Sequence, residues 1–322
     1  MLKKLLTVRN LVILLAVIAL FVVSGLLGLK VPPPHVALAA EPLIHLGSFT
    51  ITNALFTTWI VMAILIVVAF ISTRSYPKNL ATAQNSDLVP GGKLGNFMEW
   101  VIEGLHGFSE SVAGKWAAKF FPIIMTIFLL IVLSNWIGLL PGVGSIGLFE
   151  HPQDAHGHTY VAHGIVMTAE EAHDGKGVIL IPFLRPPATD LNFTLALALV
   201  AVVMAQIFGV QAQKLGYFKK FFDLSGFKQG VGMGLIQVFV GLLELVSEFA
   251  RIISFSFRLF GNIFAGEVLL LVLAFLIPYI VSLPFYALEG FVGFIQGFVF
   301  FMLALVFFTL AIQGHHGEEE HH

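Results

Sequence analysis

The sequence predicts an all-α, polytopic membrane protein. Of its 322 residues, 57% are hydrophobic and only 11% are charged, whereas a soluble domain averages about 25% charged residues. Several apolar runs are long enough to cross the hydrocarbon core of a bilayer, about 30 Å, as helices. These runs lack the alternation of a lipid-facing β-barrel strand, so α-helices are the spanning structure that satisfies every backbone hydrogen bond.

Six apolar runs qualify, at about residues 11–28, 53–72, 120–140, 191–212, 231–278 and 285–313. The last two exceed the roughly 20 residues that one crossing requires. We expect residues 1–52 to form an N-terminal hydrophobic segment and an outer loop, and residues 53–313 to form the membrane domain. Residues 314–322 read GHHGEEEHH and are expected to form a polar tail.

The cationic residues orient these segments. If the segments alternate, one side of the membrane receives twelve cations: Lys3, Lys4, Arg9, Arg74, Lys78, Lys93, Lys115, Lys119, Lys214, Lys219, Lys220 and Lys228. The other side receives three, namely Lys30, Lys176 and Arg185. Because cytoplasmic loops carry the excess of Lys and Arg, both encoded termini are expected in the cytoplasm. The loops at 29–52, 141–189 and 279–284 are then outside.

The first segment has two interpretations. A Lys-rich start, an apolar stretch and Ala37-Leu38-Ala39 resemble a cleavable signal sequence, but the stretch is also long enough to be a retained helix. The sequence leaves both open, and the orientation downstream is the same. If the signal is cleaved, the mature N-terminus lies outside.

Residues 94–118 have a different, amphipathic pattern. Apolar residues recur every three or four positions from Leu94 to Val112, and Glu99, Glu103 and Glu110 lie between them. This spacing predicts an amphipathic helix at the cytoplasmic membrane surface. A helix packed on a partner protein would show the same pattern.

The composition also excludes several classes of function. The chain has no cysteine and a net charge of −2, so thiolate chemistry and nucleic-acid binding are not expected. No nucleotide-binding or hydrolase motif occurs, and no cofactor is expected. The outer loop contains several histidines, but their spacing matches no common metal motif, so no metal site is expected there.

The fifth segment is too long for an upright crossing. As one helix, residues 231–278 would extend about 70 Å. The segment therefore either breaks into two spans or crosses as one steeply tilted helix. We favour the tilted helix, which would form a hairpin with segment six around Pro278 and Pro284.

Polar residues follow one face of this helix. At 100° per residue, a stripe within about 40° of Arg258 contains Glu244, Ser247, Arg251, Ser254 and Asn262. Glu267 falls on the opposite face. In segment six, Glu289 and Gln296 share a face with Gly293, and Asp190 and Asn192 mark the outer end of segment four.

Intramembrane charges are functional candidates because each costs about 2.5–3.5 kcal/mol on insertion scales. Arg251 has Glu244 and Glu248 within two turns, so internal ion pairing competes with a functional role. Arg258 is flanked by apolar residues and has no acidic residue within a turn. We therefore expect its partner on another chain.

The string from Arg258 to Glu267, RLFGNIFAGE, resembles the signature helix of subunit a of F-type ATP synthases. The resemblance extends to NWIGLLPG at 135–142, DLNFTLALAL at 190–199, the helix of Glu244, and Gln296 within IQGFVFFML. Only residues 1–50 and the His-rich loop lie outside it.

The resemblance implies two proton half-channels that meet a rotor ring of c subunits, with the long hairpin facing the ring. Arg258 matches the stator arginine that faces the ring carboxylate. The positions that match the outer half-channel are Asn262, Glu267, Glu289, Gln296, Asp190 and Asn192, and Glu244 and Ser247 match the cytoplasmic one. The family often has histidine at the position of Glu289. Whether Glu267 or Glu289 relays the proton is therefore open.

The implied partners are the c ring, peripheral-stalk b subunits and the soluble ATPase head, in a bacterial plasma (inner) membrane. The implied role is proton transport coupled to ATP synthesis, with no nucleotide-hydrolysing site in this chain. The alternative is a self-contained secondary transporter or ion channel that uses Arg258 to bind an anion. Such transporters usually have inverted repeats and broken helices, and neither is visible here.

Overall fold

The structure is a computed structural model, and it describes residues 37–47, 49–74, 92–140, 143–150, 159–163, 166–170, 179–221, 230–276 and 283–313. The first predicted membrane segment, the turn at Pro278 and the polar tail lie outside these residues. The division into a leader, a membrane domain and a tail therefore stays a prediction.

Five helical stretches among the described residues are long and apolar enough to cross a membrane. They are α3 (Asn53–Thr73), the stretch that ends with α5 (Ala117–Gly138), α6 (Leu191–Gln213), α7 (Val231–Leu276) and α8 (Leu283–Ile312). The prediction of an all-α, polytopic membrane protein is confirmed. Two of the helices start with a side-chain cap, because Thr52 accepts from the backbone N–H of Leu55 at the start of α3, and Asp190 caps α6.

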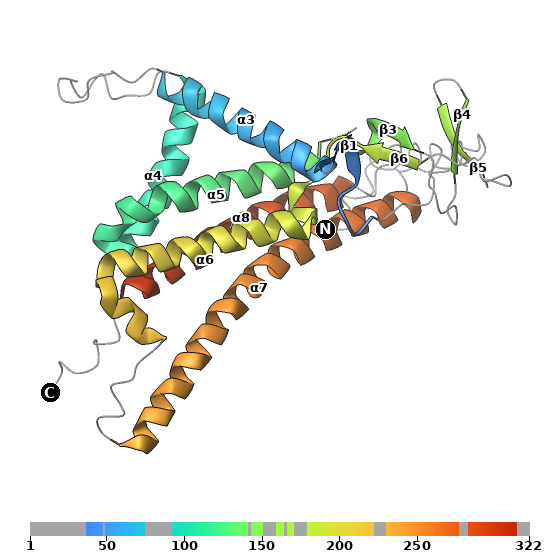
Figure 1. The fold of residues 1–322 in the computed structure, drawn as a ribbon. Coiled ribbons are helices and arrows are strands. Elements are labelled where there is room, and N and C mark those ends of the chain that lie inside the picture. Colours follow the sequence, from blue (N-terminus) through green and yellow to red (C-terminus); the bar gives the residue numbers. More distant parts are fainter. Residues whose placement is uncertain are drawn as a thin grey trace, which may run out of the picture.

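Short antiparallel strand pairs add to the helices at one end of the bundle (Figure 1). The antiparallel pairs are β1 (Pro42–Leu46) with β2 (Phe49–Thr52), β3 (Gly147–Glu150) with β6 (Ile179–Pro182), and β4 (Thr159–His163) with β5 (Val166–Glu170). The sequence predicts loops in both regions, at 29–52 and 141–189. Strands of four or five residues give too little alternation to be recognised.

Helix α4 (Lys93–Ala113) crosses the opposite end of the bundle, at a large angle to α5 (Figure 1). It is shorter than the predicted helix at 94–118 because Gly114 has φ +53° and ends it. The short 3-10 helix η2 (Gly114–Trp116) then turns the chain into α5. The side chain of Trp100 on α4 is 72% exposed, which leaves apolar surface for a membrane or a partner.

Helix α7 is continuous over 46 residues, a length of about 69 Å. The alternative of two separate spans is therefore wrong. In Figure 1, α7 runs obliquely to α5, α6 and α8, and its first half extends away from them. This geometry agrees with a tilted helix paired with the 30-residue α8.

Two buried clusters hold the bundle together. In the first, the ring of Phe120 on α5 lies 4.7 Å from that of Phe208 on α6 and 5.4 Å from that of Phe308 on α8. The second cluster joins α7 to its neighbours through Phe255 and Leu259. Aromatic pairs at these separations add to the energy of packing.

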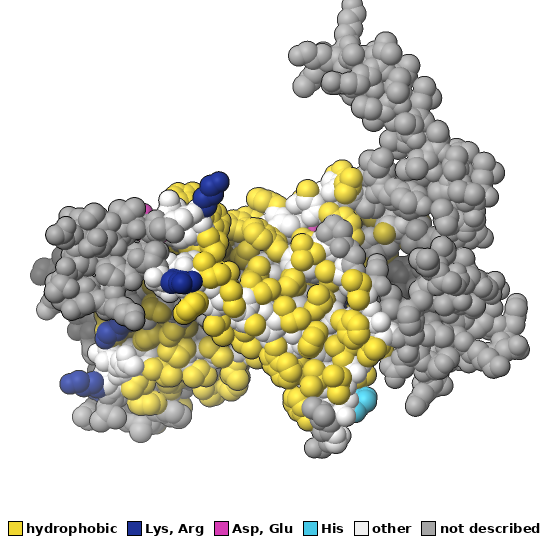
Figure 2. Space-filling view, turned by 90° about the horizontal axis from the view of Figure 1, so that it is seen from above, with side chains coloured by type: hydrophobic (Ala, Val, Ile, Leu, Met, Phe, Trp, Pro, Cys, Tyr) yellow, Lys and Arg dark blue, Asp and Glu magenta, His cyan; other side chains and the backbone are white. Residues whose placement is uncertain are grey.

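The surface matches this architecture. Hydrophobic side chains cover the middle of the described part in Figure 2, and Lys and Arg side chains gather toward one end. Together with the five long apolar helices, this band identifies a multi-pass membrane protein.

Candidate functional site

The middle of α7 presents two unlike faces. Phe255 and Leu259 are buried, whereas Arg258 and Asn262 are exposed. The ring of Phe255 lies 4.9 Å from that of Phe300 and 5.2 Å from that of Phe307, both on α8. Because side chains follow each other at 100° along a helix, this anchor turns Arg258 outward.

Arg258 makes no hydrogen bond or ion pair with any described residue. Its neighbour Phe257 is 55% exposed, so the guanidinium projects from an apolar face. A permanently charged group in such a place is costly unless water or an anion meets it. The sequence has no acidic residue within a helical turn of Arg258, and among the described residues no other segment supplies one. A partner on another chain stays a prediction.

Arg251, two turns earlier, is paired within the chain. Its guanidinium lies 2.8 Å from Glu248 and 3.9 Å from Glu244, and it stacks over Phe307 at 4.8 Å. Lys220 completes the network, with its Nζ 2.6 Å from Glu244 and 3.0 Å from Glu248. Arg251 is therefore paired within the chain, and in this network two cations balance two carboxylates.

Lys220 comes from the short 3-10 helix η5 (Lys214–Lys220). Gly241 of α7 lets the carbonyl of Phe221 approach closely, since a Cβ there would collide with it. Tyr217 is buried in the same turn and donates a hydrogen bond to Gln206 at 2.5 Å. Burial, aided by the charge of Glu248, raises the pKa of Tyr217 to about 12, so the phenol keeps its proton at physiological pH.

At the other end of α7, Glu267 binds Arg185 in the segment before α6. The Nε and Nη2 atoms of Arg185 donate to the two carboxylate oxygens at 3.3 and 3.1 Å. This is a bidentate pair, the strongest geometry for arginine and carboxylate. Glu267 thus lies away from the exposed face of Arg258, as its predicted position on the helix required.

Glu289 of α8 lies against α7 at the residue next to Glu267. Its carboxylate occupies the space that a Cβ at Gly266 would fill. Among the described residues Glu289 has no ion pair. Two carboxylates thus lie in the same part of the structure, and among the described residues only that of Glu267 is paired with a cation.

The other predicted site residues are not brought into contact with these groups. Asp190 accepts a hydrogen bond from the backbone N–H of Asn192 at 2.9 Å and so has a capping role. Asn192 is exposed, and Ser247 and Gln296 are partly buried. No hydrogen bond links Ser247, Asn262 or Gln296 to another side chain within the described ranges.

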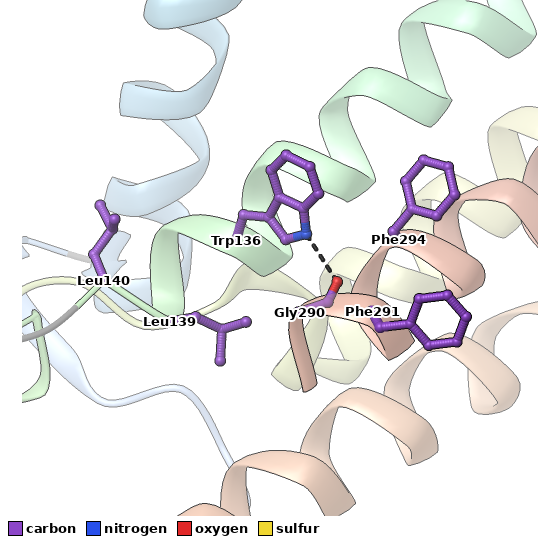
Figure 3. A pocket seen from close by; sticks show the side chains of 6 residues that line it. All are labelled: Trp136, Leu139, Leu140, Gly290, Phe291 and Phe294. Carbon is purple, nitrogen blue, oxygen red and sulfur yellow. Dashed lines mark hydrogen bonds between the residues drawn. The ribbon is translucent and has the colours of Figure 1, made fainter. Parts of the chain in front are cut away.

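A surface hollow close to Glu289 in sequence is apolar. Its walls are Trp136, Leu139, Leu140, Gly290, Phe291 and Phe294, and the indole N–H of Trp136 donates to the carbonyl of Gly290 at 2.9 Å (Figure 3). With no ionisable side chain in its walls, it is a poor route for protons. The described residues also contain no cluster of His, Asp and Glu that would hold a metal ion, and His151, His156, His158 and His173 lie outside them.

The comparisons with known proteins now decide the family. The family described as ATP synthase A chain matches residues 55–309. The chain belongs to this family. It is also 31% identical over 271 residues to ATP synthase subunit a of Gloeobacter violaceus (strain ATCC 29082 / PCC 7421), covering 84% of this chain and 86% of that protein. The resemblance seen in the sequence is confirmed.

As a member of the ATP synthase A chain family, the protein is a membrane-sector subunit of an F-type ATP synthase and has its stator role in ATP synthesis and proton transport. The matched range includes α7, all of α8 except its last three residues, and every predicted site residue. Family membership also sets aside the alternative of a self-contained transporter.

Sequence reasoning missed two members of the site. Arg185 and Lys220 were counted only as cations that orient the membrane segments. A signal was present for Arg185, which precedes Pro186-Pro187 and lies only a few residues before a membrane helix. A cation this close to an apolar membrane run favours pairing with a carboxylate over exposure to bulk water.

Proposed function

We propose that Arg258 is the stator arginine that couples proton translocation to rotation of a c ring, and that α7 and α8 contribute to two proton half-channels. The observation that carries this proposal is the contrast on α7. Arg258 is exposed and unpaired among the described residues, whereas the charged groups on both sides of it are paired within the chain.

The spacing along α7 suits two offset water paths. Glu244 lies about 21 Å from Arg258 in one direction and Glu267 about 13 Å in the other, at 1.5 Å per residue. A strongly inclined helix carries these two sites toward opposite membrane surfaces while Arg258 stays near the middle. The exposed apolar residues of α7 around Arg258 offer a surface on which a ring of helices can pass.

In this proposal, protons arrive from outside past Asp190, Asn192, Gln296 and Asn262, with Glu267 and Glu289 as the carboxylates of the outer path. Each proton neutralises a carboxylate of the ring, and rotation then carries this neutral group into the lipid phase. After almost a full rotation the proton leaves toward the cytoplasm past Ser247 and Glu244. Each proton releases about 2.3 kcal/mol per 100 mV of membrane potential.

Arg258 has two roles in this cycle. Since arginine does not lose its proton at accessible pH, it keeps the passing ring carboxylate ionised, and it blocks direct leakage between the two paths. The further assignments follow the same proposal: peripheral-stalk b subunits as partners, the plasma (inner) membrane of a bacterium, and both encoded termini in the cytoplasm.

The test is ATP-driven acidification of inverted vesicles that carry the whole complex. Arg258→Ala is expected to abolish pumping while subunit a stays assembled, and to add a proton leak. Arg74→Ala is the matched control, because Arg74 is an exposed arginine at the end of α3 and should pump normally. Undiminished pumping by Arg258→Ala would overturn the proposal.

A further inference from the structure

Arg185 is the most completely bonded cation in the described part of the chain. Its side chain is enclosed, with the residue only 5% exposed. Besides the pair with Glu267, Nη1 donates to the carbonyl of Ala39 at 2.9 Å and Nη2 donates to the carbonyl of Ala37 at 2.7 Å. All three guanidinium nitrogens therefore have acceptors.

The backbone at Arg185 is fixed as well. Its N–H donates to the Oγ1 of Thr57 on α3 at 3.1 Å. The next residue, Pro186, packs so closely on Gly138 of α5 that a Cβ there would collide with its ring. The backbone of Arg185 and Pro186 is thus anchored to α3 and α5, whereas the carboxylate that the guanidinium binds belongs to α7. The pair connects the tilted helix to the rest of the bundle.

We propose that Arg185 is a positioning residue, which holds the carboxylate of Glu267 in the outer half-channel, and that residues 37–39 form a strap that completes its binding site. This inference rests on the proposed function, in which Glu267 belongs to the proton path. A bidentate guanidinium fixes both oxygens of the carboxylate, and such placement decides how well a group can exchange protons with its neighbours.

The strap has a consequence for processing of the chain. Ala37-Leu38-Ala39 is also the sequence that resembles a signal cleavage site. Cleavage after Ala39 would remove both carbonyls that Arg185 uses and leave buried N–H donors without acceptors, which is unfavourable. The assembled subunit therefore retains residues 37–39.

The first experiment measures the pair directly. The intact complex is treated with a water-soluble carbodiimide and an amine, and modification at Glu267 is read by peptide mass spectrometry. Arg185→Gln is expected to raise this modification about tenfold, as the loss of a charged hydrogen bond predicts. Arg185→Lys keeps the charge and should restore part of the protection, and Arg74→Gln should change nothing. Equal modification in the native chain and in Arg185→Gln would overturn the positioning role.

Pumping separates this inference from the proposed function. Arg185→Gln is expected to slow ATP-driven acidification in the native chain but to cause no further loss in a Glu267→Gln background, since the group that it positions is gone. A further loss would mean that Arg185 acts only through folding. If Glu267→Gln pumps normally while Arg185 still protects Glu267, the pair exists but the proposed proton path is wrong.

The strap is tested without touching Arg185. Leu38 is 68% exposed, and the chain has no cysteine of its own. Leu38→Cys is expected to react with a maleimide in the assembled complex, as Ile44→Cys on β1 should. Labelling of Ile44→Cys without labelling of Leu38→Cys would show that the strap is cleaved off, and would overturn this part of the inference.

Discussion

Arg251 and Arg258 lie two turns apart on α7 and have opposite surroundings. Arg251 is held by Glu248 and Glu244, whereas Arg258 has no partner among the described residues. A guanidinium with two carboxylates nearby serves the packing of the fold. One that is left exposed on an apolar face is available to an anion on another chain. The same residue type thus has two roles that only its neighbours distinguish.

The ion-pair network makes a prediction at this scale. Glu248 is only 7% exposed, so Arg251→Met leaves a buried carboxylate with Lys220 as its remaining cation. We expect a loss of about 1–3 kcal/mol in stability, seen as a lower midpoint of thermal unfolding of the solubilised complex. The double variant Arg251→Met/Glu248→Gln removes the excess charge as well.

The double variant is therefore expected to unfold at a higher temperature than Arg251→Met alone. If both variants lose the same stability, the network contributes nothing beyond the packing of Arg251 on Phe307. If Arg251→Met unfolds like the native chain, the network is no more than a surface contact.

Sequence separation decides which of these contacts could be predicted. Glu248 and Arg251 are three residues apart, so helical geometry alone brings them together. Lys220 and Glu248 are 28 residues apart, and Arg185 and Glu267 are 82 apart. Their pairing depends on how α7 packs against segments far away in the chain, which no local pattern encodes.

At the scale of elements, one glycine of α7 determines where a carboxylate of α8 can lie. The carboxylate of Glu289 occupies the space that a side chain at position 266 would fill. Because that carboxylate is the far end of a flexible side chain, it can move without separating the helices. The glycine therefore fixes the position of a functional group rather than the helix packing.

Gly266→Ala tests this interpretation. We expect normal assembly and a pumping rate reduced about tenfold or more, because a displaced carboxylate loses its alignment with the proton path. Gly232→Ala is the control, since that glycine lies at the start of the same helix and a Cβ there meets nothing within 4 Å. Normal pumping by Gly266→Ala would show that the position of Glu289 is not critical.

Long elements could be predicted from the sequence, and short ones could not. The run at 231–278 is so long and uninterrupted that a single inclined helix could be predicted, and α7 is that helix. The strands could not be predicted, because β3 and β6 are short and pair across about thirty residues of intervening chain. The end of α4 at Ala113 depends on the positive φ of Gly114. A glycine in the sequence does not by itself predict that conformation.

For the whole molecule, the divergence of α7 is the dominant feature. Its first half extends away from the other helices (Figure 1) and exposes Val238, Phe239, Leu242, Val246 and Phe249. An exposed apolar surface of this kind is stable only against lipid or another protein. In the proposed function the ring covers this face and the bilayer covers the remaining apolar surface. The divergent shape of α7 is then explained by the ring that packs against it.

The orientation in the membrane is the prediction that tests the whole fold. Lys93 and Arg74 lie at the end of the bundle opposite the β-strand pairs, and the positive-inside rule assigns that end to the cytoplasm. The absence of native cysteine allows single-cysteine labelling with a membrane-impermeant maleimide. We expect Ile44→Cys to be labelled in right-side-out vesicles and Lys93→Cys only in inverted ones.

Both positions are exposed, so their accessibility depends on the side of the membrane and not on burial. Ala117→Cys is the control, because Ala117 is completely buried and should react in neither preparation until the protein is denatured. The reverse labelling of Ile44→Cys and Lys93→Cys would show that the orientation in the membrane is opposite to the predicted one. The path at Glu267 would then open to the cytoplasm and the path at Glu244 to the outside, so the direction of every proposed proton step depends on this result.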